Sequence, residues 1–568
     1  MTLSPSLPSR TAVTLQQLFD AKDSNSHKLQ QALATMIVSS EQGSSAQSDS
    51  KPVGSISDIA FNEFCLDSRQ LASKDVFVLL QSHIPNCQKS RDHLFQAANN
   101  AAFILSEIDP SALISAANAP AHANITLTDE SISAEQQLAL LPCPILYLPN
   151  MRDFLGSLIQ ARLQYSQPVK LPAVVAVTGT NGKTTISQLV AQLTQLTGMS
   201  SAVMGTAGNG RLGALVQASH TTGDALAVQQ FLYQMGTENA ELLALEASSH
   251  GLDQQRLQGM PVSVAIYTNL SRDHLDYHAD MAEYAAAKAR LFDKAHFPEL
   301  THAIINIDDD SAQIMLDTAQ ASNLTVWTYS LDSSKIATFV AAVIKPSLQG
   351  VEISLRTDLG DGEVNHLDIV SPLLGRFNVA NLLASIAAAV ALGISLESIE
   401  AIVPHLQGAV GRMQRVPSND GCFIVDYAHT PDALSQVLAS LKTHCKGQLW
   451  AVFGCGGDRD AGKRPLMAQA GLTGADKVVL TADNPRTEDP NMILQDMQVG
   501  MSAEQYQRTY IEPARQKAIE YAVSQAAVED IVVIAGKGHE TYQEINNVRY
   551  DFDDSVILHN ALVQAGRV

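Results

Sequence analysis

The sequence lacks paired cysteines and an excess of positive charge. Its six cysteines are scattered along 568 residues without a CxxC pair. Neither a disulfide framework nor a zinc site is therefore expected. The scattered cysteines fit a protein in a reducing compartment. The 37 Lys and Arg residues are outnumbered by 58 Asp and Glu, for a formal net charge of -21. This balance argues against a broad nucleic-acid or anionic-membrane surface, although it allows a small basic pocket for an anionic metabolite.

Long hydrophobic runs are also missing. The most apolar helical stretch, "LLASIAAAVALGI" at 382–394, is too short to cross a bilayer. The N-terminus has no basic segment followed by an apolar core, so no signal peptide is predicted. We expect a cytoplasmic protein without membrane insertion that works on small molecules, binds no nucleic acid and is a monomer.

The composition and length predict several globular domains. Hydrophobic residues make up 46% of the chain and charged residues 17%, which is typical of proteins with buried cores. A chain of this length divides into roughly three or four domains. The Ser/Gln-rich stretch 39–55 is predicted to be a flexible loop, and the Ala/Ser-rich stretch 106–135 to hold a surface insertion.

Short β-branched runs alternate with helical patterns along most of the chain, which predicts parallel sheets covered by helices. The runs include "AVVAVTG", "LLALEAS", "VAIYTN" and, after residue 421, "CFIVDYA", "LWAVFGCGG", "KVVLTADNP" and "IVVIAGKG". The predicted fold class is α/β with three domains. They are a small N-terminal α/β domain (1–170), a central phosphate-loop-type parallel sheet with helices on both faces (171–407) and a Rossmann-like C-terminal domain (408–568).

A phosphate-binding loop is predicted at Gly179–Thr185, between a strand and a helix. The usual pattern has a glycine where this chain has Val177, and here a glycine comes two residues later. Lys183 is placed to reach the β- and γ-phosphates, and the Thr184 hydroxyl to hold Mg²⁺. Backbone N–H groups at the helix N-terminus would cradle phosphate oxygens. The loop residues are Gly179, Thr180, Asn181, Gly182, Lys183, Thr184 and Thr185.

Three further residues are interpreted from the sequence around each of them. Glu246 ends a buried-looking strand, where a carboxylate suits Mg²⁺ ligation. From the sequence alone, His274 is interpreted as a hydrogen-bonded loop histidine rather than a ligand. Lys288 lies in an Ala-rich helix and, taken alone, is interpreted as a solvated lysine.

A series of motifs from about residue 60 to the C-terminus resembles, in order, the ATP-dependent Mur ligases. In that family Val177 is normal in the phosphate loop. The first 60 residues and the stretch 106–135 carry none of the resemblance. The motifs are "VTGTNGKTT", "EASSHGL", "TNLSRDHLDYH", "YAAAK", "GRFNVAN", "GRMQRV", "DYAHTPDAL", "GCGGDRD", "DNPRTEDP" and "GKGHE".

The resemblance implies a two-step ligation in peptidoglycan precursor synthesis. The D-glutamate γ-carboxylate of UDP-N-acetylmuramoyl-L-alanyl-D-glutamate would attack ATP to give an acyl phosphate, which the amine of meso-diaminopimelate would then attack. The resemblance also implies that CO₂ carbamylates Lys288, which reverses the solvated interpretation. The implied catalytic residues are Lys183, Glu246, His274 and Lys288, and the implied Mg²⁺ ligands are Thr184, Glu246, His274 and Lys288.

The resemblance assigns binding residues to each substrate. At His83 the flanking sequence departs from the family pattern, and His220 stands where the family often has Asn. The nucleotide-precursor residues are Leu66, Ser68, His83, His220, Thr221, Thr222, Ser248, Gln254 and Arg256. The adenosine residues are Asn378, Asn381, Arg412 and Asp426, for which helix capping and turn formation are the alternatives. The diaminopimelate residues are Arg459, Asp483, Asn484, Pro485, Arg486, Gly536 and Glu540.

Two other functions compete with this interpretation. A folylpolyglutamate synthetase shares the phosphate loop and the carbamylated lysine, but the uridine-type N-terminal domain and "DNPR" argue against it. A non-catalytic ATP-binding scaffold would bind ATP without releasing phosphate. The complete set of implied Mg²⁺ ligands argues against a scaffold.

Overall fold

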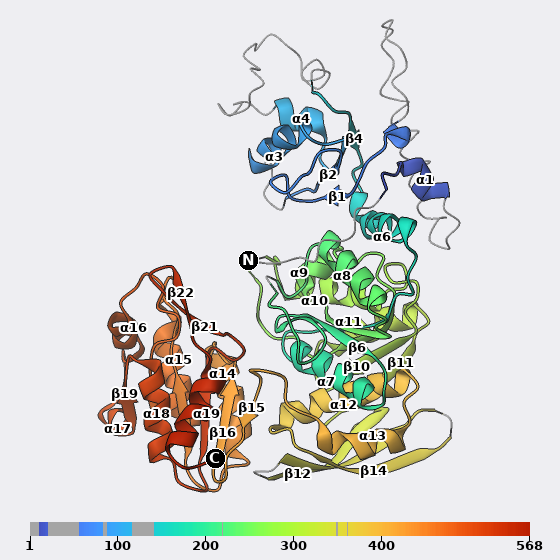
Figure 1. The fold of residues 1–568 in the computed structure, drawn as a ribbon. Coiled ribbons are helices and arrows are strands. Elements are labelled where there is room, and N and C mark those ends of the chain that lie inside the picture. Colours follow the sequence, from blue (N-terminus) through green and yellow to red (C-terminus); the bar gives the residue numbers. More distant parts are fainter. Residues whose placement is uncertain are drawn as a thin grey trace, which may run out of the picture.

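The computed structural model describes residues 11–20, 56–82, 88–115, 141–218, 220–275, 277–347, 350–360 and 362–568. Within them the strands form three sheets and a separate hairpin, and the ribbon shows one group of elements around each sheet (Figure 1). The mixed α/β fold class is therefore confirmed. The predicted loop at 39–55 and most of the predicted insertion lie outside the described residues, but 110–115 form a helix.

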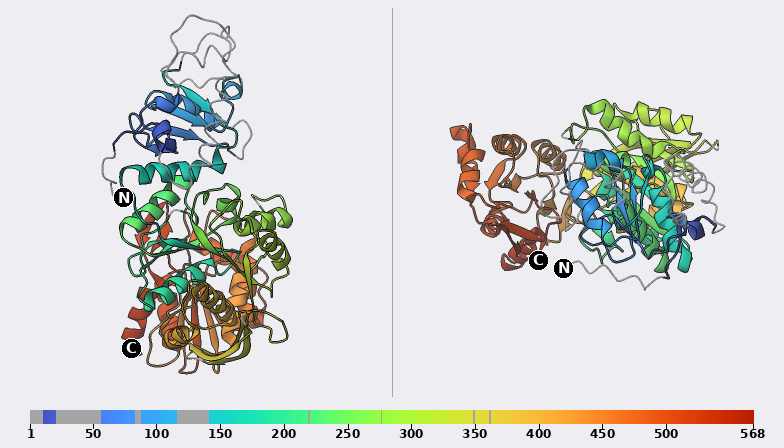
Figure 2. Two further views of the ribbon diagram at one scale, coloured as in Figure 1. Left: turned by 90° about the vertical axis from the view of Figure 1, so that its right-hand side faces the viewer. Right: turned by 90° about the horizontal axis from the view of Figure 1, so that it is seen from above.

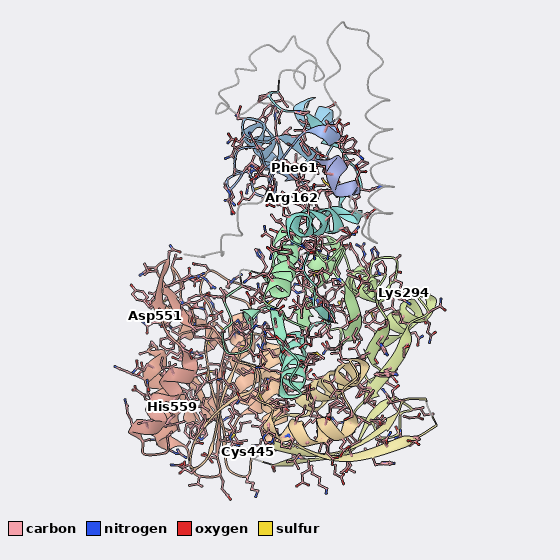
Figure 3. The ribbon with its side chains drawn as sticks, turned by 45° about the vertical axis from the view of Figure 1, so that its right-hand side comes forward. Phe61, Arg162, Lys294, Cys445, Asp551 and His559 are labelled. Atoms are coloured by element: carbon pink, nitrogen blue, oxygen red, sulfur yellow. The ribbon has the colours of Figure 1, made fainter. Side chains whose placement is uncertain are left out.

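The first sheet is small and parallel, in the order β1-β2-β3-β4. Helix α6 lies under it and carries Arg162, which is fully buried and donates through Nε to the Asn62 carbonyl at 2.6 Å (Figure 3). The strands are β1 (Phe64–Cys65), β2 (Val76–Leu79), β3 (Phe103–Ser106) and β4 (Ile145–Tyr147). The helices are α1 (Leu15–Asp20), η1 (Ile56–Asp58), α3 (Gln88–Ala98), α4 (Pro110–Ser115), η2 (Met151–Asp153) and α6 (Leu155–Ser166).

The central sheet is larger than predicted and is not wholly parallel. Its order is β14-β13-β12-β11-β10-β9-β5-β8-β6-β7. The predicted parallel strands form its middle, whereas β12–β14 and the β6–β7 pair are antiparallel. The strands are β5 (Ala173–Thr178), β6 (Ser201–Gly205), β7 (Gly208–Gly210), β8 (Leu242–Glu246), β9 (Val262–Tyr267), β10 (His302–Asn306), β11 (Thr325–Ser330), β12 (Phe339–Ser347), β13 (Gly350–Asp358) and β14 (Val364–Ser371).

Helices cover both faces of the parallel strands, as predicted. In β5, Val175 and Val177 belong to the core under α7 and α12, and Val174 and Ala176 to the core under α8 and α11. A strand buried on both faces reads as a continuous apolar run, which explains "AVVAV". The helices are α7 (Lys183–Leu196), α8 (Ala225–Thr237), α9 (Ser249–Asp253), α10 (Met281–Ala289), η3 (Arg290–Phe292), α11 (Ala312–Ala321), α12 (Arg376–Ala391), α13 (Leu396–Ile402) and η4 (Val403–His405).

The third sheet has the order β15-β16-β20-β17-β18-β19, and only its β15–β16 pair is antiparallel. The strands are β15 (Gln414–Val416), β16 (Cys422–Asp426), β17 (Leu449–Phe453), β18 (Lys477–Leu480), β19 (Thr509–Ile511) and β20 (Ile531–Ala535), followed by the hairpin β21 (Tyr542–Ile545) and β22 (Val548–Asp551). The helices are α14 (Pro431–Lys442), α15 (Lys463–Gly474), α16 (Pro490–Met497), α17 (Ala503–Gln507), α18 (Arg515–Gln525) and α19 (Asp554–Gln564).

Contacts at the start of α12 join the third sheet to the central one. The Gly375 N–H donates to His444 Nε2 at 3.1 Å, and the Arg376 N–H donates to the Ser440 hydroxyl at 3.0 Å. Two views show the third group beside the central one and the first group at its far end (Figures 1 and 2). Among the described residues, no helix is both long and apolar enough to cross a membrane.

Helices α18 and α19, which pack on the third sheet, are joined by a fully buried ion pair whose loss should destabilise the fold. Arg515 Nη2 lies 2.6 Å from Asp554 Oδ2, and both side chains are 0% exposed. Asp554→Ala leaves a buried unpaired guanidinium, so we expect a loss of about 3–5 kcal/mol in the free energy of unfolding of this sheet. Urea unfolding followed by Trp450 fluorescence measures it in a Trp327→Phe background, because the chain has only two tryptophans.

The matched control for this change is Asp420→Ala, whose partner Arg567 lies nearer the surface, with side chains 35% and 12% exposed. Because Asp420 is partly exposed to water, its loss should cost about 1 kcal/mol, less than the loss of Asp554. Equal losses in the two variants would contradict the dependence on burial.

Candidate active site

The phosphate loop lies where the β5 strand ends and α7 begins. Val177 is fully buried in β5, so the position that lacks the usual glycine is a core strand residue. The loop's own glycines have left-handed backbones, with φ 146° at Gly179 and 91° at Gly182. A Cβ at Gly179 would lie 1.8 Å from Thr268 Oγ1, and one at Gly182 would lie 2.6 Å from Asn381 Oδ1. Only glycine fits these two positions.

Two lysine side chains converge on one carbonyl of this loop. Lys183 Nζ donates to the carbonyls of Gly179 and Thr180 at 2.9 and 2.8 Å. Lys288 Nζ, from α10, donates to the same Gly179 carbonyl at 3.0 Å. Burial lowers the pKa of Lys183, while the Glu246 carboxylate opposes that shift. The phosphate loop and Lys288 therefore belong to one site.

Lys288 is not a solvated lysine. Its side chain is 1% exposed, and its Nζ lies 4.4 Å from the centre of the Tyr284 ring. Burial, reinforced by the nearby Lys183, lowers the pKa of Lys288 well below its usual value. A lowered pKa favours the uncharged, nucleophilic form of the amine. The interpretation from its Ala-rich helix alone is wrong, because that helix buries this face against the loop.

Glu246 lies at the end of β8, as predicted, with its carboxylate turned toward the phosphate loop. Its Oε1 accepts from the Thr184 hydroxyl at 2.9 Å and from the Thr206 N–H at 2.8 Å. The residue is 2% exposed. A hydroxyl and a carboxylate held together in this way are the hard oxygen donors that Mg²⁺ prefers, so the residues present fit this ion.

His274 lies on the loop after β9 in a left-handed conformation, with φ 54°. Its ring centre lies 5.9 Å from that of Tyr284, the same ring that Lys288 contacts, and 5.0 Å from that of His250. Within the described residues, no group of three or more His, Cys, Asp and Glu side chains is arranged to hold a metal ion. The Mg²⁺ ligands implied by the resemblance are not such a group, since two of the four are a threonine and a lysine.

The residues expected to bind the nucleotide precursor gather next to Glu246. The Thr222 hydroxyl donates to the Glu246 carbonyl at 2.8 Å and accepts from the Ser248 N–H at 3.0 Å. Arg256 Nη1 donates to the Thr222 carbonyl at 2.9 Å, and its Nη2 to Gln254 Oε1 at 2.7 Å. The structure thus brings these residues to the edge where β5 and β8 end, which is where ligands bind in open α/β sheets.

Thr221 belongs to the same group, because it accepts from the hydroxyl of Thr206, a residue that also bonds Glu246. The remaining nucleotide-precursor residues are dispersed, and His220 is exposed. Ser68 belongs to the first sheet, where its hydroxyl bonds His93 Nδ1 at 2.7 Å. Leu66 packs against the core of that sheet. His83 lies outside the described residues.

The expected adenosine residues lie between the central and third sheets. Asp426 ends β16 and accepts from the backbone N–H groups of Met413 and Ala428 at 2.7 and 2.8 Å. Burial raises the pKa of Asp426, and nearby Arg412 opposes the shift. Arg412 also lowers the pKa of Lys183 across the two sheets, and its Cζ lies 4.5 Å from the centre of the Tyr427 ring.

The two asparagines of α12 are buried and joined, since Asn381 Nδ2 donates to Asn378 Oδ1 at 3.1 Å. Asn378 Nδ2 donates to the Leu374 carbonyl at 2.8 Å, so it also fixes the start of the helix. The closeness of Asn381 Oδ1 to Gly182 places that side chain against the phosphate loop.

The "DNPR" turn follows β18 and is bonded to the β21–β22 hairpin. Arg486 has φ 51°, its N–H donates to the Glu544 carbonyl at 2.9 Å, and its carbonyl accepts from the Asn546 N–H at 2.6 Å. Its Nη1 donates to the Gly457 carbonyl at 2.7 Å. A Cβ at Gly457 would lie 2.0 Å from the Pro485 carbonyl oxygen, and one at Gly456 would lie 3.8 Å from Arg459 Cγ. The turn therefore packs against the "GCGGDRD" loop.

Asp483 follows β18 and Gly536 follows β20, at the same edge of the third sheet. A Cβ at Gly536, where φ is 117°, would lie 3.0 Å from Asp483 Oδ2. Within the described residues, Asp483 Oδ1 is buried and accepts no hydrogen bond. Burial raises the pKa of Asp483, opposed by Arg515 and Lys537. Such an acceptor fits the ammonium of a ligand.

Sequence reasoning missed Thr206, Lys537 and Arg515. Thr206 bonds Glu246 and Thr221 and, through its backbone, the His539 side chain of "GKGHE", so it joins the central and third sheets. Lys537 is fully buried among the diaminopimelate candidates. The "GKGHE" motif signalled Lys537, whereas Thr206 and Arg515 lie in stretches without a motif.

Two family models match this chain. Residues 177–389 match the Mur ligase middle domain, and residues 411–538 match the family described as Mur ligase, glutamate ligase domain. Together these segments cover most of the described chain. The chain belongs to the Mur ligase family.

Two curated Mur ligases show how far the similarity extends. Both are named UDP-N-acetylmuramoyl-L-alanyl-D-glutamate–2,6-diaminopimelate ligase. The one from Pseudomonas aeruginosa is 47% identical over 399 residues, which cover 70% of this chain and 79% of the relative. The one from Vibrio parahaemolyticus is 39% identical over 510 residues, covering 88% and 94%.

Two solved structures are also similar to this chain. A structure with the same name is 40% identical, with a TM-score of 0.67, and covers 98% of this chain and 100% of the other. The folylpolyglutamate synthase of Mycobacterium tuberculosis, complexed with ADP and AMPPCP, has a TM-score of 0.53 at 18% identity and covers 68% of this chain and 92% of its own. That second likeness shows a shared fold alone.

Proposed function

We propose that this Mur ligase joins meso-diaminopimelate to the D-glutamate γ-carboxylate of UDP-N-acetylmuramoyl-L-alanyl-D-glutamate, consuming ATP and forming ADP and phosphate. The observation that carries the proposal is the combination of two clusters. One holds the phosphate loop with Glu246 and Lys288. The other is the turn in which Arg486 bonds the Gly457 carbonyl and Asp483 keeps a buried oxygen, Oδ1, that accepts no hydrogen bond from the described residues. The names of the similar Mur ligases support the same reaction.

The first step brings a carboxylate to the γ-phosphate of ATP, so repulsion between two anions has to be cancelled. The backbone N–H groups at the start of α7 receive the phosphates. The N–H groups of Thr180 and Asn181, earlier in the loop, are bonded to Asn269. The Lys183 ammonium, which bonds the loop carbonyls here, turns to the β- and γ-phosphate oxygens. Arg412 adds a second positive charge from the third sheet.

We propose that Mg²⁺ and a Lys288 carbamate complete this cluster. Thr184, Glu246, His274 and carbamylated Lys288 would hold the ion, which supplies positive charge between the carboxylate and the phosphates. The burial and lowered pKa of Lys288 support carbamylation, because an uncharged amine is the form that attacks CO₂.

The second step needs the amine of the amino acid at the acyl phosphate while water is excluded. The His539 contact with Thr206 holds the third sheet against the central one, close to Glu246. The Gly536 N–H also donates to the Asp426 carbonyl at 3.1 Å. One expected amino-acid residue and one expected adenosine residue are thus neighbours at the same edge of the third sheet, which supports binding of the two substrates close together.

We further propose that each of three segments of the chain binds a different substrate. Residues 1–170 would bind the nucleotide precursor, 171–407 the ATP and 408–568 the incoming amino acid. Such an enzyme would work as a monomer in the cytoplasm, where ATP and the nucleotide precursor are available.

The assay that tests the function is phosphate release from ATP with the nucleotide dipeptide and a panel of amino acids, among them meso-diaminopimelate, L-lysine and L-ornithine. We expect phosphate release to depend on meso-diaminopimelate together with the nucleotide dipeptide. Binding of ATP without release under any of these conditions would contradict the proposal and favour a scaffold.

Replacing Arg486 should remove most of the amino-acid specificity. Meso-diaminopimelate carries a second amino-acid head, called here the distal head, with one carboxylate and one ammonium, and L-lysine lacks that carboxylate. Arg486 can pair with the carboxylate through two N–H groups. In Arg486→Ala we expect the ratio of kcat/KM for meso-diaminopimelate over L-lysine to fall by about a hundredfold or more.

The control is Arg549→Ala on the neighbouring hairpin, which removes an exposed guanidinium 4.2 Å from the Tyr542 ring centre. It should leave the ratio unchanged. A ratio in Arg486→Ala equal to that of the unmodified enzyme would overturn the assignment of Arg486.

A further inference from the structure

Lys537 places an ammonium inside the pocket that the proposed function gives to the distal head. It follows Gly536 directly after β20, and its side chain is 0% exposed. Its Nζ donates to Asn484 Oδ1 at 3.1 Å and to Glu540 Oε2 at 3.2 Å, and lies 3.7 Å from Asp483 Oδ1. All three partners belong to the set expected to bind diaminopimelate.

The same ammonium orders the side chains around it. Asn484 Nδ2 donates to Glu540 Oε2 at 2.9 Å, and Asn484 Oδ1 also accepts the Glu544 N–H at 2.9 Å. Lys537 therefore closes a small network in which Glu540 and the amide of Asn484 each have a fixed orientation. A buried network with its members satisfied is rigid, which suits recognition of a small polar ligand.

Charge gives Lys537 a second role. Asp483 and Glu540 bring two carboxylates to the pocket, and Lys537 is the cation that contacts both. Arg515, which also lies near Asp483, is paired with Asp554, and Glu544 lies 3.8 Å from Arg486. Of the two carboxylates that Lys537 contacts, one negative charge then remains for one ligand ammonium, while Arg486 takes the ligand carboxylate. Without Lys537 the acceptor side would carry two uncompensated charges and would favour a ligand with more positive charge. L-lysine, with one carboxylate and two ammonium groups, is such a ligand, whereas meso-diaminopimelate is balanced.

We propose that Lys537 is a specificity-determining residue of this pocket. By neutralising one of the two carboxylates and fixing Asn484 and Glu540, it adapts the pocket to a distal head that carries one ammonium and one carboxylate. This inference rests on the proposed function, and it differs from the role of Arg486 because Lys537 acts on the acceptor side and selects by net charge.

The test compares Lys537→Met, which keeps an unbranched side chain one atom shorter and removes the charge, with the unmodified enzyme at pH 8.5. We expect KM for meso-diaminopimelate to rise about tenfold or more and the kcat/KM ratio of meso-diaminopimelate over L-lysine to fall about tenfold, with KM for ATP unchanged. A purely structural defect would lower turnover of both amino acids alike. The matched control is Arg549→Met, which removes a cation from the hairpin outside the network.

A second variant covers the case in which Lys537→Met does not fold. Lys537→Met combined with Glu540→Gln removes the buried cation together with the carboxylate that it contacts, whose side chain is 20% exposed, and so leaves no extra carboxylate unpaired. We expect it to fold and to recover most of the preference for meso-diaminopimelate over L-lysine, at a raised KM for both amino acids. An unchanged ratio in Lys537→Met, or an unchanged KM for meso-diaminopimelate in the double variant, would overturn the role of Lys537. If the unmodified enzyme did not use meso-diaminopimelate, the proposed function itself would fail.

Discussion

Lys183→Ala should lower ATP-dependent turnover by about a thousandfold or more. The reason is charge, because the reaction brings a carboxylate to a triphosphate and the variant removes a cation from the loop between them. Lys183 is the cation that bonds the Gly179 and Thr180 carbonyls at the mouth of the phosphate loop. The measurement is phosphate release with both co-substrates saturating.

The control for Lys183→Ala is Lys345→Ala on β12, where the side chain is 70% exposed and lies 3.8 Å from Glu352. It removes the same charge from the protein surface and should keep full turnover. Near-normal phosphate release in Lys183→Ala would exclude the phosphate loop from the mechanism.

Lys288→Ala should also lose turnover, by about a hundredfold or more, while ADP binding measured by calorimetry changes little. Lys288 reaches the site through the Gly179 carbonyl and does not form part of the loop itself. If its carbamate is the active form, acetate or another short carboxylic acid should restore part of the activity by supplying a carboxylate in its place. Removal of CO₂ and bicarbonate should lower the activity of the unmodified enzyme, because the carbamate cannot then form.

Lys294→Ala is the matched control for Lys288→Ala, since Lys294 is exposed on the neighbouring surface (Figure 3). We expect it to keep full activity with no response to acetate. Full activity of Lys288→Ala without any added acid would contradict the carbamate.

The sequence predicted the parallel strands well because a strand buried on both faces needs a continuous apolar run, and such runs are visible in the residues themselves. It did not predict the antiparallel strands β12–β14. In β14 buried and exposed residues alternate, and alternation over a short stretch is a weaker signal that helix patterns can imitate.

Some features of the candidate site could be predicted from the sequence, and others could not. Motifs with glycine at fixed positions, such as Gly179 and Gly182, were readable because their backbone requirement is local. The burial of Lys288 and the pairing of Arg515 with Asp554 were not, because they depend on contacts between residues far apart in the chain. For Lys288 the local pattern even pointed the wrong way, since an Ala-rich helix with a lysine is typical of a solvated face.

Two candidate site residues, His274 and Arg486, have backbones in the region that glycine and asparagine adopt most easily, with φ of 54° and 51°. Each such residue costs on the order of 1 kcal/mol relative to an unstrained one. Glycine at position 486 would relieve that strain, yet it would also remove the guanidinium that the turn presents. A laboratory search for thermostable variants would therefore tend to collect substitutions at these two positions and lose the selectivity and the metal ligation proposed for them. In such a search, the two positions are best held fixed from the start.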